Sequence, residues 1–158
     1  MKKLTAILMA LCLLCGACAA LADMEIPTFD SMPGVVIEDD KTTVDEAAFL
    51  GEWVLQNAFA DREFLTEQTL VEEYDFNFMP YVIEKGVVTQ DIQDENGEFH
   101  TVEMPYTFEA GQLQGKDAKG RDFVFELLED GNVVMSVFFP GEGDEVVCLS
   151  VFMVHPVG

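Results

Sequence analysis

The spacing of apolar and polar residues in the second half of the chain predicts a series of short β-strands. Runs rich in Val, Phe, Thr and Met alternate with turn residues from Gly86 onward. Short strands at regular spacing with such turns are typical of an antiparallel meander, and Asn96-Gly97 predicts a type I′ hairpin. The turn signals are Gly86, Asn96-Gly97, Ala110-Gly111, Gly115, Gly120, Gly131-Asn132 and residues 141–143.

Alternation within these runs indicates which strands are covered on both faces. Phe123, Phe125 and Leu127 share one face of a strand, and Asp122, Val124 and Glu126 share the other. Residues 133–139 and 146–154 are apolar on both faces, so both strands must be covered. Pairing the last strand with the first would remove both free edges. We therefore predict an all-β fold, a small antiparallel meander that closes into a β-barrel of about eight strands.

The segment before the meander is predicted to enter the barrel through a short helical turn. Thr43 is placed to cap a turn over residues 44–48, Gly51 ends it, and Trp53 begins the first strand. Residues 61–84 are harder to interpret. We expect a helix or loop to about Thr69, followed by a strand through residues 74–78 because polar and aromatic residues alternate there.

The N-terminus has the features of a secretory signal peptide. Lys2 and Lys3 precede an apolar run over residues 4–14, and small residues follow up to Ala22. We predict cleavage after Ala22 and a secreted, extracytoplasmic product with no membrane span. The alternative is a lipoprotein anchored at Cys18, which Gly and Ala precede.

The predicted domain organisation has three parts: a signal peptide over residues 1–22, an acidic flexible arm over 23–42 and a barrel domain over 43–158. The formal net charge of the whole chain is −22, and removal of Lys2 and Lys3 with the signal makes it −24. Such a charge argues against nucleic acid or an anionic membrane surface as a partner.

Residues for catalysis or metal binding are scarce. Only Cys148 remains after removal of the signal, which excludes an internal disulfide. No serine lies in a G-x-S-x-G sequence, and no Cys/His spacing is that of a metal site. The acidic turns lack the ligand spacing of an EF-hand. We expect no enzymatic activity, no cofactor and no bound metal.

Two histidines are present. His100 alternates with Val102 and Met104, so we expect it on their face, as a satisfied histidine of the barrel core or rim. His155 lies beyond the last predicted strand, beside Pro156, and is expected to be exposed.

Gly51-Glu52-Trp53, after a short helical turn and at the start of a meander, resembles the G-x-W entry strand of the lipocalins and of short lipocalin-like domains in secreted bacterial proteins. The resemblance covers about residues 44–154 and implies a barrel with Trp53 at its floor. Lipocalins also place an arginine near the last strand, packed across the tryptophan. No arginine follows Arg121 in this chain.

Two functions are compatible with these features. The first is non-enzymatic binding of a small hydrophobic ligand in the barrel, because aromatic and Met residues suit an apolar ligand. The alternative is an extracytoplasmic protein-interaction or cell-envelope module with a filled core, working through outward Val134 and Phe138. The oligomeric state stays open. The expected ligand-binding residues are Trp53, Phe99, Met104, Phe123, Phe125 and Met135.

Overall fold

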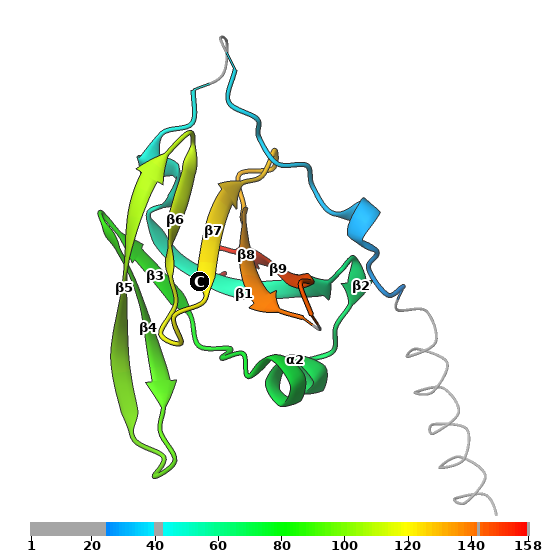
Figure 1. The fold of residues 1–158 in the computed structure, drawn as a ribbon. Coiled ribbons are helices and arrows are strands. Elements are labelled where there is room, and N and C mark those ends of the chain that lie inside the picture. The colour runs from blue at the N-terminus through cyan, green and yellow to red at the C-terminus, as the bar shows by residue number, and fades with distance from the viewer. Residues whose placement is uncertain (1–24, 40–42, 142, 158) are drawn as a thin grey trace, which may run out of the picture.

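The computed structural model describes residues 25–39, 43–141 and 143–157. The predicted signal peptide and the two alternative processing sites, Ala22 and Cys18, lie outside these residues. Figure 1 shows a barrel of strongly curved strands. The described residues contain one short α-helix. The strands are β1 (Gly51–Ala60), β2 (Glu63–Phe64), β3 (Tyr81–Glu84), β4 (Val87–Gln93), β5 (Phe99–Glu109), β6 (Gln112–Lys116), β7 (Asp122–Leu127), β8 (Val133–Pro140) and β9 (Val146–Val154). The helical elements are η1 (Phe29–Ser31), η2 (Glu46–Phe49) and α2 (Glu67–Tyr74).

All strand pairs are antiparallel, and the sheet closes on itself. From β3 to β9 each strand pairs with the next, while β1 pairs with both β3 and β9. Eight strands therefore form a closed barrel, and β2 is an extra strand hydrogen-bonded to the end of β1. The predicted fold class, an antiparallel meander closing into a barrel of about eight strands, is confirmed.

The two longest strands form the corners of the barrel. In β1, Gly51 to Trp53 pair with β3, and Val54 to Ala60 pair with β9. In β5, residues up to Pro105 pair with β4, and residues from Tyr106 onward pair with β6. Each long strand thus passes from one side of the barrel to the other, which is how twisted sheets close.

The alternation predicted for β7 and β8 places their apolar residues in the core as expected. Phe123, Phe125 and Met135 are all 1% exposed or less. Gly115, which we had interpreted as a turn residue, lies within β6. A Cβ atom there would come within 2.6 Å of both the Phe123 ring and the Pro105 carbonyl oxygen, so glycine allows this ring to pack against the strand.

Residues 25–39, within the segment predicted to be an acidic arm, run along the outside of the barrel. The Val36 amide donates to the Leu127 carbonyl at 2.8 Å, and the Glu129 amide donates to the Gly34 carbonyl at 2.9 Å. Val35 forms an isolated bridge with Leu128. We refer to residues 25–39 as the N-terminal segment.

The N-terminal segment covers an apolar area on the outer face of the barrel. Phe29 and Met32 pack against a cluster that includes Val134 and Phe152. Val134 is only 4% exposed, whereas Phe138 on the same strand is 37% exposed. Of the two residues expected to form an outward patch, one is therefore covered by the chain itself.

The region between β1 and β3 differs from the prediction. Asp61 and Arg62 both have positive φ and make a tight turn into β2, so no helix begins there. Helix α2 starts later, with Thr66 as its N-cap accepting from the Thr69 amide, and it ends at Asp75 in the left-handed conformation. The predicted strand over residues 74–78 is wrong. Leu70 of α2 is buried in the barrel core, and this tertiary contact outweighs the local alternation.

Two local details also differ. The helical turn before β1 is η2, capped by Asp45 rather than Thr43, since the Asp45 carboxylate accepts from the Ala47 amide at 2.9 Å. In the β4–β5 hairpin only Gly97 has positive φ, +84°, and Asn96 does not, so the type I′ prediction is wrong. Among the described residues, no helix is long and apolar enough to cross a membrane.

Candidate functional site

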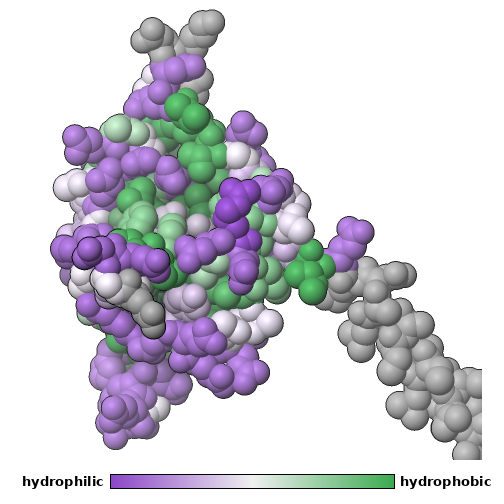
Figure 2. Space-filling view, turned by 45° about the vertical axis from the view of Figure 1, so that its right-hand side comes forward, coloured by the Kyte–Doolittle hydropathy of each residue, from purple (hydrophilic) through white to green (hydrophobic). Residues whose placement is uncertain are grey.

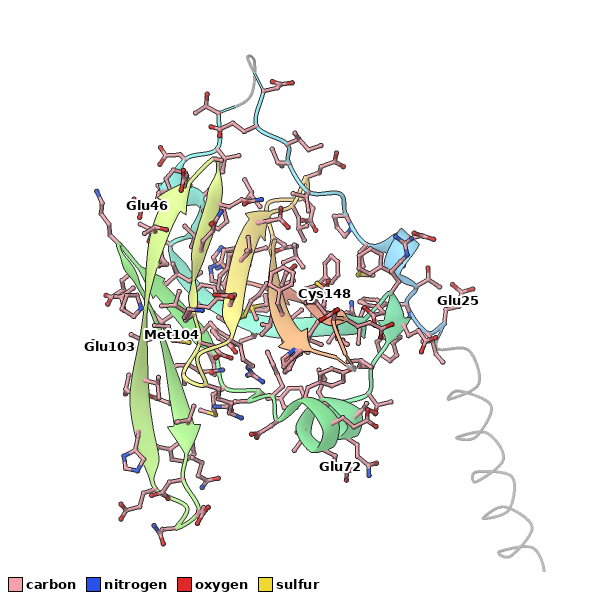
Figure 3. All side chains as sticks on the ribbon, in the orientation of Figure 1. Glu25, Glu46, Glu72, Glu103, Met104 and Cys148 are labelled. Atoms are coloured by element: carbon pink, nitrogen blue, oxygen red, sulfur yellow. The ribbon has the colours of Figure 1, made fainter. Side chains whose placement is uncertain are left out.

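A cleft of about 300 Å³ lies at the end of the barrel beside α2. It is bounded by the loop after α2, by the far half of β4 and by the β6–β7 turn. We call it the mouth cleft. Figure 3 shows Met104 on the inner side of β5 near this end, with Glu46 at the opposite end of the barrel. The lining residues are Asp75, Phe76, Asn77, Tyr81, Gln90, Ile92, Gln93, Met104, Asp117, Ala118, Lys119 and Arg121.

The floor of the mouth cleft is apolar and aromatic. Phe76, Tyr81 and Met104 are each at most 6% exposed. The Phe76 and Tyr81 rings lie 6.2 Å apart between centroids, and Tyr81 makes an edge contact with Phe125 deeper in the core. Burial raises the pKa of the Tyr81 hydroxyl, so it stays protonated and acts as a neutral hydrogen-bonding group.

Gln90 places an amide in this otherwise apolar floor. It is the one polar residue classed as buried in the part of the chain that the structure describes. Its side-chain nitrogen donates to the Met79 carbonyl at 2.8 Å and to the Asn77 carbonyl at 3.2 Å. Because buried amides are costly unless they are satisfied, these bonds fix both Gln90 and the loop after α2.

The rim of the mouth cleft carries an ordered ion pair. The Arg121 Nε donates to an Asp117 carboxylate oxygen at 2.5 Å, and an Arg121 terminal nitrogen donates to the Tyr74 carbonyl at 3.1 Å. The guanidinium also lies 4.5 Å from the Phe139 ring centroid. The two charged side chains are only 18% and 9% exposed, so the guanidinium is held at the edge of the cleft.

A second cation lies on the same rim. The Lys119 ammonium pairs with the Asp75 carboxylate, and this contact lowers the pKa of Asp75 below its ordinary value. Although the chain is strongly acidic, three of its eight Lys and Arg residues, Lys116, Lys119 and Arg121, lie in the one β6–β7 hairpin. Two of these three line the mouth cleft.

The residues predicted to bind ligand are divided between the core, the cleft and the surface. Met104 lines the mouth cleft. Phe123, Phe125 and Met135 pack with one another and with further side chains to fill the interior. Phe99 does not join them: it is 57% exposed on the part of β5 that extends beyond the barrel.

Trp53 lies at the closed end, away from the cleft. Its indole nitrogen donates to the Phe49 carbonyl at 2.7 Å, and the His155 ring stacks on it with centroids 3.7 Å apart. The His155 Nδ1 atom lies 2.9 Å from the Glu52 carbonyl oxygen. A Cβ atom on Gly51 would meet the imidazole at 3.3 Å, so glycine leaves room for this ring. Sequence reasoning missed the stack, although His155 directly follows the last strand.

His100 lies outside the barrel, so the expectation of a core or rim histidine is wrong. Its side chain is 55% exposed, and its Nε2 atom is 3.1 Å from an Asp94 carboxylate oxygen. Asp94, Glu98 and His100 bring one potential ligand atom each within 4.8 Å at the tip of the β4–β5 hairpin. The hydrogen bond from His100 lowers the pKa of Asp94. Alternation gave the correct face of β5 but not the point at which the strand leaves the barrel.

No protein-family model matches this chain, and no curated protein matches it significantly. Its function is therefore inferred from its own geometry.

Proposed function

We propose that this chain is an exported, non-enzymatic binding protein of the lipocalin-like type, which holds one small amphipathic molecule in the mouth cleft. The observation that carries the proposal is the cleft itself, with an apolar floor, a satisfied amide in the floor and two cations, Arg121 and Lys119, on the rim. Its volume of about 300 Å³ is at the lower end of the range for small-ligand sites.

The chemistry of the lining favours a ligand with two parts. Phe76, Tyr81 and Met104 would contact an apolar body, and the thioether can adapt to its shape. Arg121 and Lys119 would contact a polar or anionic group at the entrance, because a planar guanidinium binds carboxylates and similar anions well. The proposed site thus differs from a central cavity for a wholly hydrophobic molecule.

Two observations support the lipocalin-like assignment. Gly51, Glu52 and Trp53 begin the first strand of a closed eight-stranded barrel, with the tryptophan buried at its floor. The ring of His155 lies across Trp53, in the position where the resemblance implies an arginine. The stack would close this end of the barrel and leave the other end for the ligand.

The placement of the histidines supports a binding role over an enzymatic one. His100 is bonded to Asp94 on the hairpin beyond the barrel, and His155 is stacked on Trp53 at the closed end. Neither residue lines the mouth cleft. Of the titratable residues that do line it, Asp75, Asp117 and Lys119 are held in ion pairs, and burial raises the pKa of the Tyr81 hydroxyl.

The test uses anilinonaphthalene sulfonate, a fluorescent probe with an aromatic body and an anionic group, added to the folded protein. We expect saturable one-to-one binding, with shifts in the NMR signals of Gln90 and Met104. Ala118→Trp should weaken binding at least roughly tenfold, because it places a large side chain on an exposed position that lines the cleft.

Ala47→Trp is the matched control, since Ala47 is an exposed alanine at the opposite end of the barrel. Equal loss of binding in both variants, or shifts confined to another surface, would contradict the cleft as the site. Native mass spectrometry of protein from its producing cells would then identify the natural cargo through its added mass.

A protein-interaction role is a second candidate, and one observation favours it. Part of β5 has an edge that no described strand covers.

A further inference from the structure

The β4–β5 hairpin extends beyond the barrel, as its position at the lower left of Figure 1 shows. Pairing between β3 and β4 stops at Tyr81↔Gln90, and pairing between β5 and β6 stops at Tyr106↔Gly115. Among the described residues, the strand segments beyond these points pair only with each other across the hairpin. The Asp91 carbonyl, on the β4 side, also accepts from the Asn77 side-chain amide at 2.9 Å. We call the portion from residue 91 to residue 103 the outer hairpin.

The alternation of main-chain hydrogen bonds along β5 shows which N–H and C=O groups lie on its open edge. The Tyr106 amide donates to the Gly86 carbonyl, on the β4 side. In an antiparallel ladder such bonded positions recur at every second residue, so Met104 and Val102 also use their main-chain groups on β4. The N–H and C=O groups of Phe99, Thr101 and Glu103 then face the opposite edge.

Pro105 explains why β6 does not cover this edge. Pro105 lies two residues after Glu103, so its nitrogen also points to the β6 side of the strand. Proline has no N–H to donate there. The β5–β6 ladder therefore begins at Tyr106↔Gly115, one residue after Pro105 along β5. Within the described parts of the chain, no strand pairs with Phe99 to Glu103 on this side.

The charge around the open edge is strongly negative. The outer hairpin, residues 91–103, contains five carboxylates and no Lys or Arg. Thr101 lies opposite Asp91 and donates to its carboxylate at 2.6 Å, so Asp91 and Glu103 belong to the same face of the outer hairpin. The surface in Figure 2 is correspondingly hydrophilic at its lower end, where the hairpin tip lies.

We propose that this open edge of β5 binds an extended segment of another protein, rich in Lys or Arg, as an added β-strand. Main-chain hydrogen bonds to Phe99, Thr101 and Glu103 would supply affinity, as in other cases of strand addition. The surrounding carboxylates would select a basic segment. Phe99, which is 57% exposed, offers an apolar contact at the end of the edge.

The same charges oppose the simplest competing occupant, a second copy of this chain. Two outer hairpins side by side would bring their carboxylates together with no Lys or Arg from either hairpin between them, and like charges on neighbouring strands are destabilising. The edge is therefore open to a cationic strand and closed to self-association. This inference is independent of the mouth cleft, because Phe99, Thr101 and Glu103 do not line it.

The test uses two capped heptapeptides as probes, one of alternating Lys and Thr and one of alternating Glu and Thr. Each is titrated into isotope-labelled protein at low salt. We expect the lysine peptide alone to bind, and to slow hydrogen exchange of the Thr101 and Glu103 amides. No slowing at saturation, or equal binding of the glutamate peptide, would overturn the proposal.

Two charge reversals distinguish strand addition from general attraction to an acidic protein. Glu103→Lys lies on the open edge, whereas Glu109→Lys lies on the same strand but in the part that β6 covers. We expect the first to weaken binding roughly tenfold, since a favourable cross-strand pair becomes repulsive, and the second to change it less than about threefold. Equal weakening by both would overturn the proposal.

Thr101→Pro removes one main-chain donor without changing the charge. The Thr101 N–H faces the open edge, so the bonds between β4 and β5 should persist, as the amide spectrum of β4 would report. We expect binding of the lysine peptide to fall at least roughly fivefold. Unchanged binding in a variant with an intact spectrum would show that the main chain of the edge is not used.

Discussion

At one end of the barrel Trp53 is completely buried, with its indole nitrogen bonded to Phe49 and its face covered by His155. At the other end Gln90 lies in the floor of a cleft. Arg121 and Lys119 lie on its rim, each in an ion pair with an aspartate. The same strands run between both ends, so the difference comes from the residues at the strand ends and in the loops.

The comparison separates residues that stabilise the fold from residues that shape a site. Burial of large rings contributes strongly to stability, and at the closed end the Trp53 ring is completely buried. A partly buried ion pair contributes little net stability, because desolvation of the charges offsets their attraction. The ordered charges at the mouth are therefore better explained by their position above the cleft than by a contribution to folding.

Removal of the tryptophan should have the largest effect. Trp53→Ala leaves a cavity at the closed end and should lower the free energy of unfolding by about 3–5 kcal/mol. Urea denaturation followed by circular dichroism measures the change. Phe138→Ala is the control, since that ring is 37% exposed and should cost less than about 1 kcal/mol. Similar costs for both would show that the closed end does not stabilise the barrel in this way.

Removal of the Arg121 guanidinium should weaken ligand binding strongly and lower the stability of the fold only slightly. Arg121→Gln removes the pair with Asp117, which is mostly but not wholly buried, and should cost only about 1–2 kcal/mol of stability. Binding of anilinonaphthalene sulfonate should fall roughly tenfold or more. Lys116→Gln, in the same hairpin but not lining the cleft, should leave binding unchanged. If Arg121→Gln binds the probe normally, Arg121 does not contact the ligand.

Replacement of the stacked histidine should give a smaller effect. His155→Ala removes the ring from Trp53 and should cost about 0.5–1.5 kcal/mol. His155→Arg should restore most of that loss, because a guanidinium can also lie flat on an indole. Thermal unfolding of the three proteins, monitored through Trp53 fluorescence, gives the comparison. A deficit in His155→Arg as large as in His155→Ala would argue against an equivalent role for these side chains.

The smallest effect concerns the exposed pair at the rim. Lys119 lowers the pKa of Asp75 in the folded protein, so the pair stabilises the fold above the ordinary aspartate pKa. This contribution should disappear as the pH falls through the lowered value. Carboxyl NMR should place the Asp75 midpoint below 3.8 and show it rising in Lys119→Met. An unchanged midpoint in the variant would mean that the pair does not form in solution.

Much of the barrel could be predicted from alternation and turn residues, because both are local properties. Phe123 and Phe125 were correctly placed on the inner face of a strand. Alternation does not show how far along the barrel axis a residue lies, however. Phe99 is therefore predicted as a lining residue and His100 as a core or rim histidine, whereas β5 carries both beyond the barrel.

The candidate site was harder to predict because it depends on contacts between distant segments. Met104 was the one expected ligand contact that lines the mouth cleft. Nothing in the sequence around Gln90 indicated that it would be buried, since an amide in a strand is ordinarily exposed. Arg121 faces the cleft because its hairpin meets the end of α2, where it donates to the Tyr74 carbonyl. The sequence did not predict a helix that ends at this point.

Closure of the barrel joins the first strand to the last. Val54 pairs with Val154, 100 residues further along the chain. A ladder between such distant segments forms slowly, since the whole intervening loop must first be ordered. Until β9 has been synthesised, β1 has no partner on that side, and the nascent chain cannot close its barrel. A chain that lacks β9 therefore cannot yet be native, and completion of the last strand sets the moment at which the native state becomes accessible.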